Sequence, residues 1–339
     1  MSTPTNPIYP DLSAWMLSRP MQSGAVVNRV IELLRKHFKM FVLIGLTPIV
    51  VEILLIVPCA VFFAYAAHAQ GLDAAGTPTP AFSVVMVQLM IPLAVVLMAV
   101  FSLFETAASW AALRVDAGAE ASARQAWQVA WQQPGRSAWL MVLRVVRYSG
   151  PMILGMLLMV LGTASVAAQH GDGETPALAF VLIPLAVVLM LGGMVLGLVL
   201  YVTDCLANSA SVTENLTAWQ SIRRSVELSR GARWRIFGAA FLLYLIAMAV
   251  MMLMEIVFAV VIAIGVGLSA VLHVGTGMGM LEIGVCGLIF VPVLLIAIAV
   301  MMVMQPLYQA VIYRDLRRLE PVKTSATHPG TGFTGPQFR

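Results

Sequence analysis

The octapeptide IPLAVVLM occurs at Ile91–Met98 and again, unchanged, at Ile183–Met190, and a looser copy, VPVLLIAI, begins at Val291. None of these side chains carries a polar atom, so the octapeptide cannot bind a ligand through charge or side-chain hydrogen bonds. Its residues instead suit the hydrocarbon interior of a bilayer. The whole chain shares this character, because 60% of its 339 residues are hydrophobic and only 11% are charged, against about 25% in a typical soluble protein.

Six apolar runs are long enough to cross a bilayer, whose hydrocarbon core needs about 20 residues of helix. They lack the alternation typical of a transmembrane barrel strand, so we expect an all-α integral membrane protein with six transmembrane helices. The fifth run exceeds a single span and must tilt, protrude or break, with Gly265–Gly267 as a candidate position for a break. The runs are Met40–Ala67, Phe82–Leu113, Tyr148–Ala168, Ala177–Thr203, Ile236–Leu272 and Ile283–Tyr313.

The basic residues predict how these spans are oriented. All lysines and arginines lie before the first span, between spans two and three, between four and five, or after the sixth. The other three connections carry Asp73, Asp172, Glu174 and Glu282 instead. The positive-inside rule therefore predicts a multi-pass protein of the bacterial plasma (inner) membrane with both termini in the cytoplasm. In the alternative topology, one long run is split into two spans and one terminus lies outside.

The octapeptides open the second span of the first two hairpins, and the looser copy occupies the corresponding place in the third. A basic, half-apolar stretch precedes each hairpin and ends in Phe38, Trp139 or Trp234. These two series predict three parallel helical-hairpin repeats, at about residues 24–113, 121–203 and 211–313, each preceded by an amphipathic cytoplasmic helix. The six-span domain is expected at residues 24–320. Residues 1–23 and 321–339 are expected to be disordered cytoplasmic segments.

The amphipathic stretches combine tryptophan with arginine, which suits a helix at the membrane interface. The stretch Ser211–Glu214 has the S/T-x-x-E pattern of a capping box and is expected to begin the third such helix. Indole rings favour headgroup depth and guanidinium groups bind lipid phosphate; the alternative is that these helices only orient the spans. The candidate contacts to anionic headgroups of the cytoplasmic leaflet are Arg35, Lys36, Lys39, Trp127, Trp131, Arg136, Trp139, Trp219, Arg223, Arg224, Arg230, Arg233, Trp234, Arg235, Arg314, Arg317 and Arg318.

Three basic membrane borders resemble those of a known family. They are GAVVNRVIELLRKHFKMF at Gly24–Phe41, SVELSRGARWRIFG at Ser225–Gly238 and IYRDLRRLE at Ile312–Glu320. Together they are similar to the membrane domain of bacterial glycerophosphodiester phosphodiesterases and to its stand-alone six-span relatives of unknown function. The resemblance covers about residues 19–320, with Arg314 where a second tyrosine is common in the family. It implies a six-span membrane domain without the catalytic barrel, and hence no phosphodiesterase activity.

Polar side chains within the apolar runs suggest a different function. A charged group is costly inside hydrocarbon, so an acid there is protonated, paired or hydrated. Glu105 and Asp204 lie near the basic border, where Arg114 is a candidate partner. Glu52 and Glu255 could instead couple transport to protons or cations, a hypothesis that unchanged uptake in Glu→Gln variants of both would reject. The candidate intramembrane polar residues are Glu52, Glu105, Asp204, Glu255, Gln88 and Gln305.

No catalytic, metal-binding or cofactor-binding set can be assembled from the remaining residues. The five histidines and three cysteines are scattered, and no HExxH, CxxC, GxSxG or Walker motif occurs. Gly193 and Gly197 form a GxxxG pair that favours close helix packing. We therefore expect a non-enzymatic lipid-contacting scaffold or partner-binding module, with a small-solute or ion transporter as the alternative. Its partners would be membrane lipids and either another protein or a second copy of the chain, and no nucleic acid.

Overall fold

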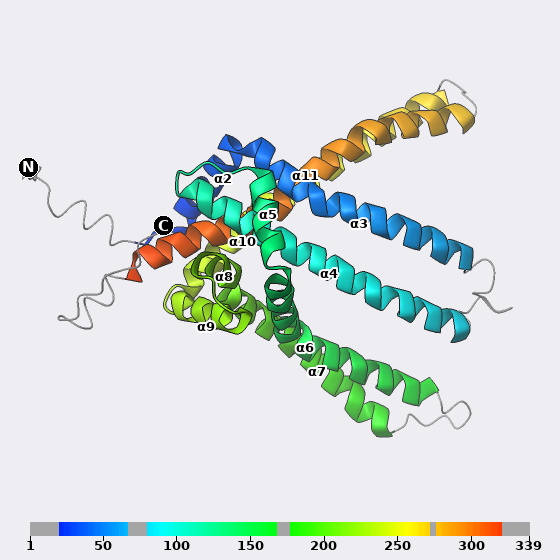
Figure 1. The fold of residues 1–339 in the computed structure, drawn as a ribbon. Helices are drawn as coiled ribbons and strands as arrows, with labels where there is room; N and C mark the ends of the chain where they lie inside the picture. The colour runs from blue at the N-terminus through cyan, green and yellow to red at the C-terminus, as the bar shows by residue number, and fades with distance from the viewer. Residues whose placement is uncertain (1–19, 67–79, 168–176, 272–275, 321–339) are drawn as a thin grey trace, which may run out of the picture.

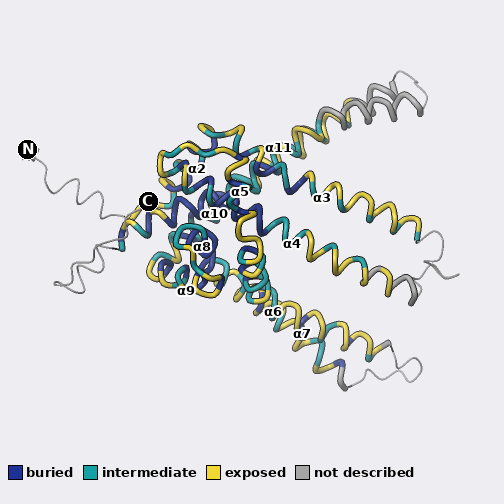
Figure 2. The backbone as a smooth tube through the Cα atoms, viewed as in Figure 1, coloured by how far each residue is buried: buried dark blue, intermediate teal, exposed yellow. Residues whose placement is uncertain are grey.

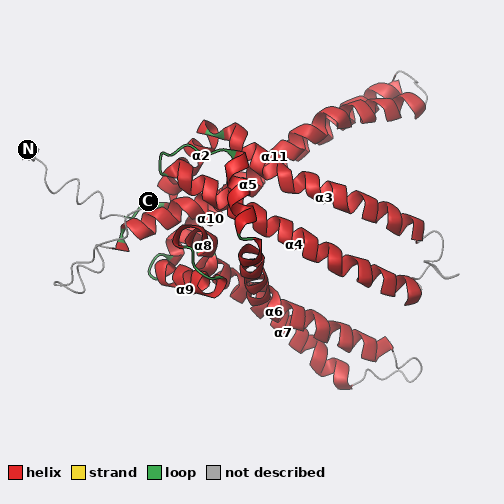
Figure 3. Ribbon diagram, in the orientation of Figure 1, coloured by secondary structure: helices red, strands yellow, loops and turns green. Residues whose placement is uncertain are grey.

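The computed structural model describes residues 20–66, 80–167, 177–271 and 276–320, and these residues form helices joined by turns, with no strand among them (Figure 3). Six of the helices are long and apolar enough to cross a membrane. The prediction of an all-α, multi-pass architecture is therefore confirmed, and each of these helices coincides with one of the six apolar runs to within one residue or extends beyond it. The six are α3 (Phe38–Ala66), α4 (Pro80–Asp116), α6 (Pro134–Ala167), α7 (Ala177–Asp204), α10 (Arg233–Val271) and α11 (Thr276–Arg318).

Four shorter helices gather at one end of the molecule, which we call the base: α2 (Ser23–Lys36), α5 (Ala123–Gln132), α8 (Ala207–Glu214) and α9 (Ala218–Ser229). From the base the helix pairs α3/α4, α6/α7 and α10/α11 run to the opposite end and spread apart on the way (Figure 1). The predicted disordered segments lie outside the described residues, except for residues 20–23. The outer connections that carry Asp73, Asp172 and Glu174 also lie outside them.

The protein's own core lies in the base (Figure 2). Its largest fully buried side chains include Phe41, Phe104, Ile236, Leu307 and Tyr313, contributed by four different long helices. Farther out, the same helices present apolar side chains to their surroundings. An apolar surface of this extent is stable only against hydrocarbon or another protein, which agrees with an integral membrane protein.

The last two long helices differ from the sequence-based expectation. Helix α10 continues without interruption through Gly265–Gly267, so the predicted break is absent. Helix α11 begins at Thr276 and includes residues that were expected in an outer loop. A helix can continue through glycine in hydrocarbon, because breaking it there would leave backbone N–H and C=O groups without hydrogen-bond partners. Because α11 begins at Thr276, Pro292 lies about 24 Å inside the helix, deeper than the one or two turns expected.

The second basic stretch, which was expected to be one interfacial helix, is divided by a turn at Gln133. Ser122 and Gln125 form a capping box at the start of α5, and α6 begins at Pro134. Proline suits the first position of a helix because its missing N–H would have no partner there. Arg136 and Trp139 therefore belong to the spanning helix rather than to an interfacial one.

The capping box of the third stretch was predicted at the wrong place. Residues 211–214 lie inside α8, which ends where Asn215 adopts a left-handed backbone conformation with φ of 53°. The box is formed instead by Thr217 and Gln220, whose side chains bond each other's backbone N–H groups at the start of α9.

Glycines mark the closest approaches between long helices. A Cβ atom added at Gly193 would lie 3.0 Å from the backbone nitrogen of Met152, and one added at Gly197 would lie 3.2 Å from the carbonyl oxygen of Tyr148. Helices α6 and α7 thus pack closely where the GxxxG pattern predicts it. Gly45 of α3 lies in closer contact still with the backbone of Ala299 in α11.

Candidate anion-binding site at the base

Two ion pairs join α6 to α4 and α7 near the base. Arg144 binds Glu105 of α4 at 2.6 Å, with side-chain exposures of only 4% and 11%, and Arg147 binds Asp204 of α7 at 3.1 Å. The two acids are therefore paired, but not with Arg114. Arg114 lies nine residues beyond Glu105 on the same helix, about 13 Å away along its axis, so its side chain cannot reach that carboxylate.

Buried hydroxyl and amide groups surround these ion pairs and join the elements of the base. The hydroxyl of Thr106 in α4 bonds that of Ser137 in α6 at 2.9 Å, and the amide of Asn208 in α8 donates to Ser109 of α4 at 3.4 Å. The hydroxyl of Ser225 in α9 donates to the carbonyl of Thr203 at 2.7 Å. Such bonds are directional, so they fix the rotation of each helix about its axis.

The inner face of α9 was not identified from the sequence. Ser221, Ser225 and Ser229 are all fully buried there. Their spacing of four residues places them on one face of the helix and was the signal that could have identified it. Small hydroxyl side chains allow α9 to lie close against the bundle while satisfying its polar groups.

Two aspartates at the base each bind two arginines. Asp116, at the end of α4, binds Arg29 of α2 at 3.1 Å and Arg314 of α11 at 2.7 Å. Burial lowers the pKa of the Arg29 guanidinium, but hydrogen bonds and charge from Asp116 and Glu32 raise it by more, so its pKa stays above the ordinary value. This arginine is therefore charged at any physiological pH.

The second aspartate repeats this arrangement. Asp315 binds Arg235 of α10 at 3.0 Å and Arg318 of α11 at 2.7 Å, and it also accepts a hydrogen bond from the backbone N–H of Met21. Each aspartate is thus shared between two guanidinium groups, and Arg29 is also paired with Glu32 at 3.0 Å.

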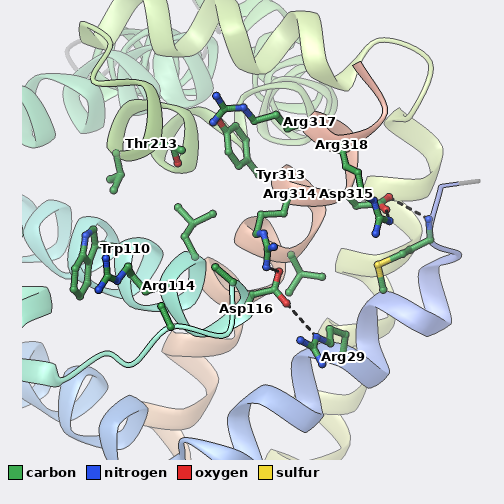
Figure 4. A pocket seen from close by; sticks show the side chains of 16 residues that line it. Arg29, Trp110, Arg114, Asp116, Thr213, Tyr313, Arg314, Asp315, Arg317 and Arg318 are labelled. Carbon is green, nitrogen blue, oxygen red and sulfur yellow. Dashed lines mark hydrogen bonds and ion pairs between the residues drawn. The ribbon is translucent and has the colours of Figure 1, made fainter. Parts of the chain in front are cut away.

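A pocket of about 920 Å³ opens between these groups (Figure 4). The guanidinium of Arg114 lies 5.4 Å from the centre of the Trp110 ring on one side, and Arg29 and Arg314 converge on Asp116 on the other. Among the described residues, Arg114 has no carboxylate partner. The charged residues that line the pocket are Arg29, Arg114, Arg314, Arg317, Arg318, Asp116 and Asp315.

The predicted headgroup contacts separate into a set that makes contacts within the base and a set that is exposed without such contacts. In the first set, Arg224, Arg235, Arg314, Arg317 and Arg318 approach carboxylates, Arg136 donates to Asn215 at 2.6 Å, and Trp127 packs against the core, although Arg314 and Arg318 are themselves exposed. The exposed set is Arg35, Lys36, Lys39, Trp131, Trp139, Trp219, Arg223, Arg230, Arg233 and Trp234.

The remaining intramembrane candidates do not come together. Glu52 is half-buried on α3, and Glu255 is exposed on α10. In the described part of the chain neither carboxylate has a hydrogen bond or ion pair with Gln88, Gln305 or any other residue, and neither lines the pocket above. Gln309, which the sequence did not single out, is buried in α11.

No group of three or more His, Cys, Asp or Glu side chains within residues 20–66, 80–167, 177–271 and 276–320 could hold a metal ion. No family model, curated protein or solved structure matches the chain. The case for function therefore depends on the geometry of the base.

Proposed function

We propose that this protein is a lipid-contacting scaffold of the bacterial inner membrane whose base faces the cytoplasm and binds anionic headgroups. The observation that carries the proposal is the position of its exposed aromatic and basic side chains. Lys39 is the second residue of α3, Trp139 the sixth of α6 and Trp234 the second of α10, so each lies within about 9 Å of the base end of a spanning helix. Tryptophan and basic residues favour that depth.

The short helices support the same proposal. Helix α2 buries Val26, Val30 and Leu33 and exposes Arg35 and Lys36 in its last turn. On α9, Arg223 lies 5.6 Å from the centre of the exposed Trp219 ring. Both helices thus present cationic or aromatic groups on the face turned away from the core, as a helix at the bilayer interface does.

In this proposal, the chain consists of three parallel units, and each unit is a short helix followed by a hairpin of two long helices. The units are α2–α4, α5–α7 and α9–α11. The recurrence of a short helix at the base before each pair of long helices supports this interpretation. The resemblance to phosphodiesterase membrane domains agrees with a non-enzymatic role in which the base contacts lipid or holds a partner protein.

Replacing three exposed arginines tests the proposal. In nanodiscs assembled from phosphatidylglycerol and phosphatidylethanolamine, we expect the native protein to retain phosphatidylglycerol preferentially. In the R223Q/R230Q/R233Q variant, mass spectrometry of the retained lipids should show this preference reduced about fivefold or more, because one basic residue near an anionic surface contributes about 1 kcal/mol.

The matched control is R223K/R230K/R233K, which keeps the three charges and should keep the preference. Salt should weaken the preference of the native protein, since exposed charges are screened. An unchanged preference in the glutamine variant would contradict the proposed headgroup contacts.

The orientation of the base has its own test. In a chain whose three native cysteines are replaced, we expect a cysteine at the exposed Arg124 to react with an impermeant maleimide only from the cytoplasmic side. A cysteine at Ala75, between the first two spans, should react only from the opposite side. The reverse labelling pattern would place the base outside the cell and refute the positive-inside assignment.

A further inference from the structure

We infer that the pocket between the base ends of α4, α8 and α11 is a specific site for a phosphate monoester. The inference deepens the proposed function and rests on it only in placing the base at headgroup depth. It concerns side chains that face the pocket, and none of the exposed tryptophans lines it.

The charge balance of the pocket calls for an anion. Five arginines and two aspartates line it, and two glutamates outside the lining face two of these arginines: Glu32 lies 3.0 Å from Arg29, and Glu214 lies 4.0 Å from Arg317. Among the described residues, Arg114 has no carboxylate partner, and Arg317 has only this long contact. The aspartates cannot neutralise more, because Asp116 and Asp315 each already bind two arginines. Arginine suits phosphate particularly well, since its planar fork of N–H donors matches two phosphate oxygens.

Two arginines are available for this role without breaking a strong ion pair. Arg114 has only the ring of Trp110 beside it. Arg317 is 4.0 Å from Glu214, and its Nη1 donates to the Tyr313 hydroxyl at 3.4 Å, so both contacts are long. A bound phosphate would gain charge-assisted hydrogen bonds from both guanidinium groups at little cost to the fold.

Apart from Thr213 and Tyr313, the rest of the lining is apolar and suits the carbon portion of the ligand. Trp110, Leu113, Val212 and Val311 contribute to the wall, from α4, α8 and α11. A site that combines an arginine cluster with an apolar wall fits a phosphate group on an organic carrier better than inorganic phosphate. A monoester carries up to two negative charges and a diester only one, so the two guanidinium groups without a close carboxylate, those of Arg114 and Arg317, favour the monoester.

Calorimetric titration of the full-length protein, purified in detergent and stripped of lipid, tests the inference. Dioctanoyl phosphatidate should bind at one site per chain, about tenfold or more tighter than the diester dioctanoyl phosphatidylglycerol. The R114Q/R317Q variant should lose at least about tenfold in affinity for phosphatidate, since hydrogen bonds between charged groups are the strong ones. The control, R124Q, removes a charge from an exposed position outside the pocket and outside the proposed headgroup contacts, and should bind as the native protein does.

The pH dependence gives a second readout. Phosphatidate affinity should rise from pH 5.5 to pH 7.5, because a phosphate monoester loses its second proton near pH 6 and arginine does not titrate in this range. Phosphatidylglycerol, a diester, should show no such rise. R114K keeps the charge but loses the planar fork, so it should bind with intermediate affinity.

Glycerol 3-phosphate distinguishes the two sources of a monoester. Binding as tight as that of phosphatidate would support a soluble phosphate ester as the ligand, and much weaker binding would support a lipid. Equal affinity for monoester and diester, or the same loss in R124Q as in R114Q/R317Q, would overturn the inference. The native protein could bind phosphatidate in the pocket and yet show no preference for phosphatidylglycerol in nanodiscs. That result would refute the proposed headgroup contacts and would still support the phosphate site.

Discussion

Replacing Arg144 with methionine should destabilise the protein by about 3–5 kcal/mol, because the substitution leaves the Glu105 carboxylate buried without a counter-charge. The melting temperature of the detergent-solubilised protein, followed by intrinsic fluorescence, measures the effect. Arg124→Met, on the exposed surface of α5, is the matched control and should change the melting temperature little.

The double variant E105Q/R144M separates the two contributions to that loss. It removes both charges together, so no ion remains unpaired, and much of the stability should return. A double variant as unstable as R144M alone would show that the arginine stabilises the base through packing rather than by pairing with Glu105.

The second large effect is expected at Gly45, where α3 and α11 cross. Even alanine adds a Cβ that meets the backbone of Ala299, and backbone cannot move aside as a flexible side chain can. The helices must separate, and overpacking of this kind costs about 1–3 kcal/mol. We therefore expect G45A to lower the melting temperature.

Gly192→Ala is the control, and the expected sign is opposite. Gly192 is also inside a long helix, but a Cβ there would meet nothing within 4 Å. Alanine should then stabilise by about 0.5–1 kcal/mol, because glycine loses more conformational freedom in a helix. A G45A variant as stable as G192A would show that the close contact between α3 and α11 is not made.

The spanning helices could be predicted from the sequence because hydropathy acts locally. A run such as Ala177–Thr203 needs no knowledge of its neighbours to be recognised, and α7 differs from it by a single residue. Helix starts are less certain where the same pattern occurs twice. Both Ser211…Glu214 and Thr217…Gln220 fit a capping box, and the chain uses the second.

The site could not be predicted in this way, because its residues come from distant parts of the chain. Arg29, Arg114 and Arg314 line one pocket from three different helices. Hydropathy does not specify how each helix is rotated, so it cannot say that Arg144 faces Glu105. The sequence predicted that basic residues gather at one end, and only the packing separates those that pair with carboxylates of the base from those that do not.

The place of α11 in the base constrains how the protein is made. This helix, which follows the other long helices in the described part of the chain, supplies Leu307, Tyr308 and Tyr313 to the core, and its Arg314 reaches Asp116 of the first helix pair. The earlier helices leave the ribosome before α11 is made, so the core of the base stays incomplete until α11 packs against them. Biogenesis of the base can therefore finish only after α11 has been inserted.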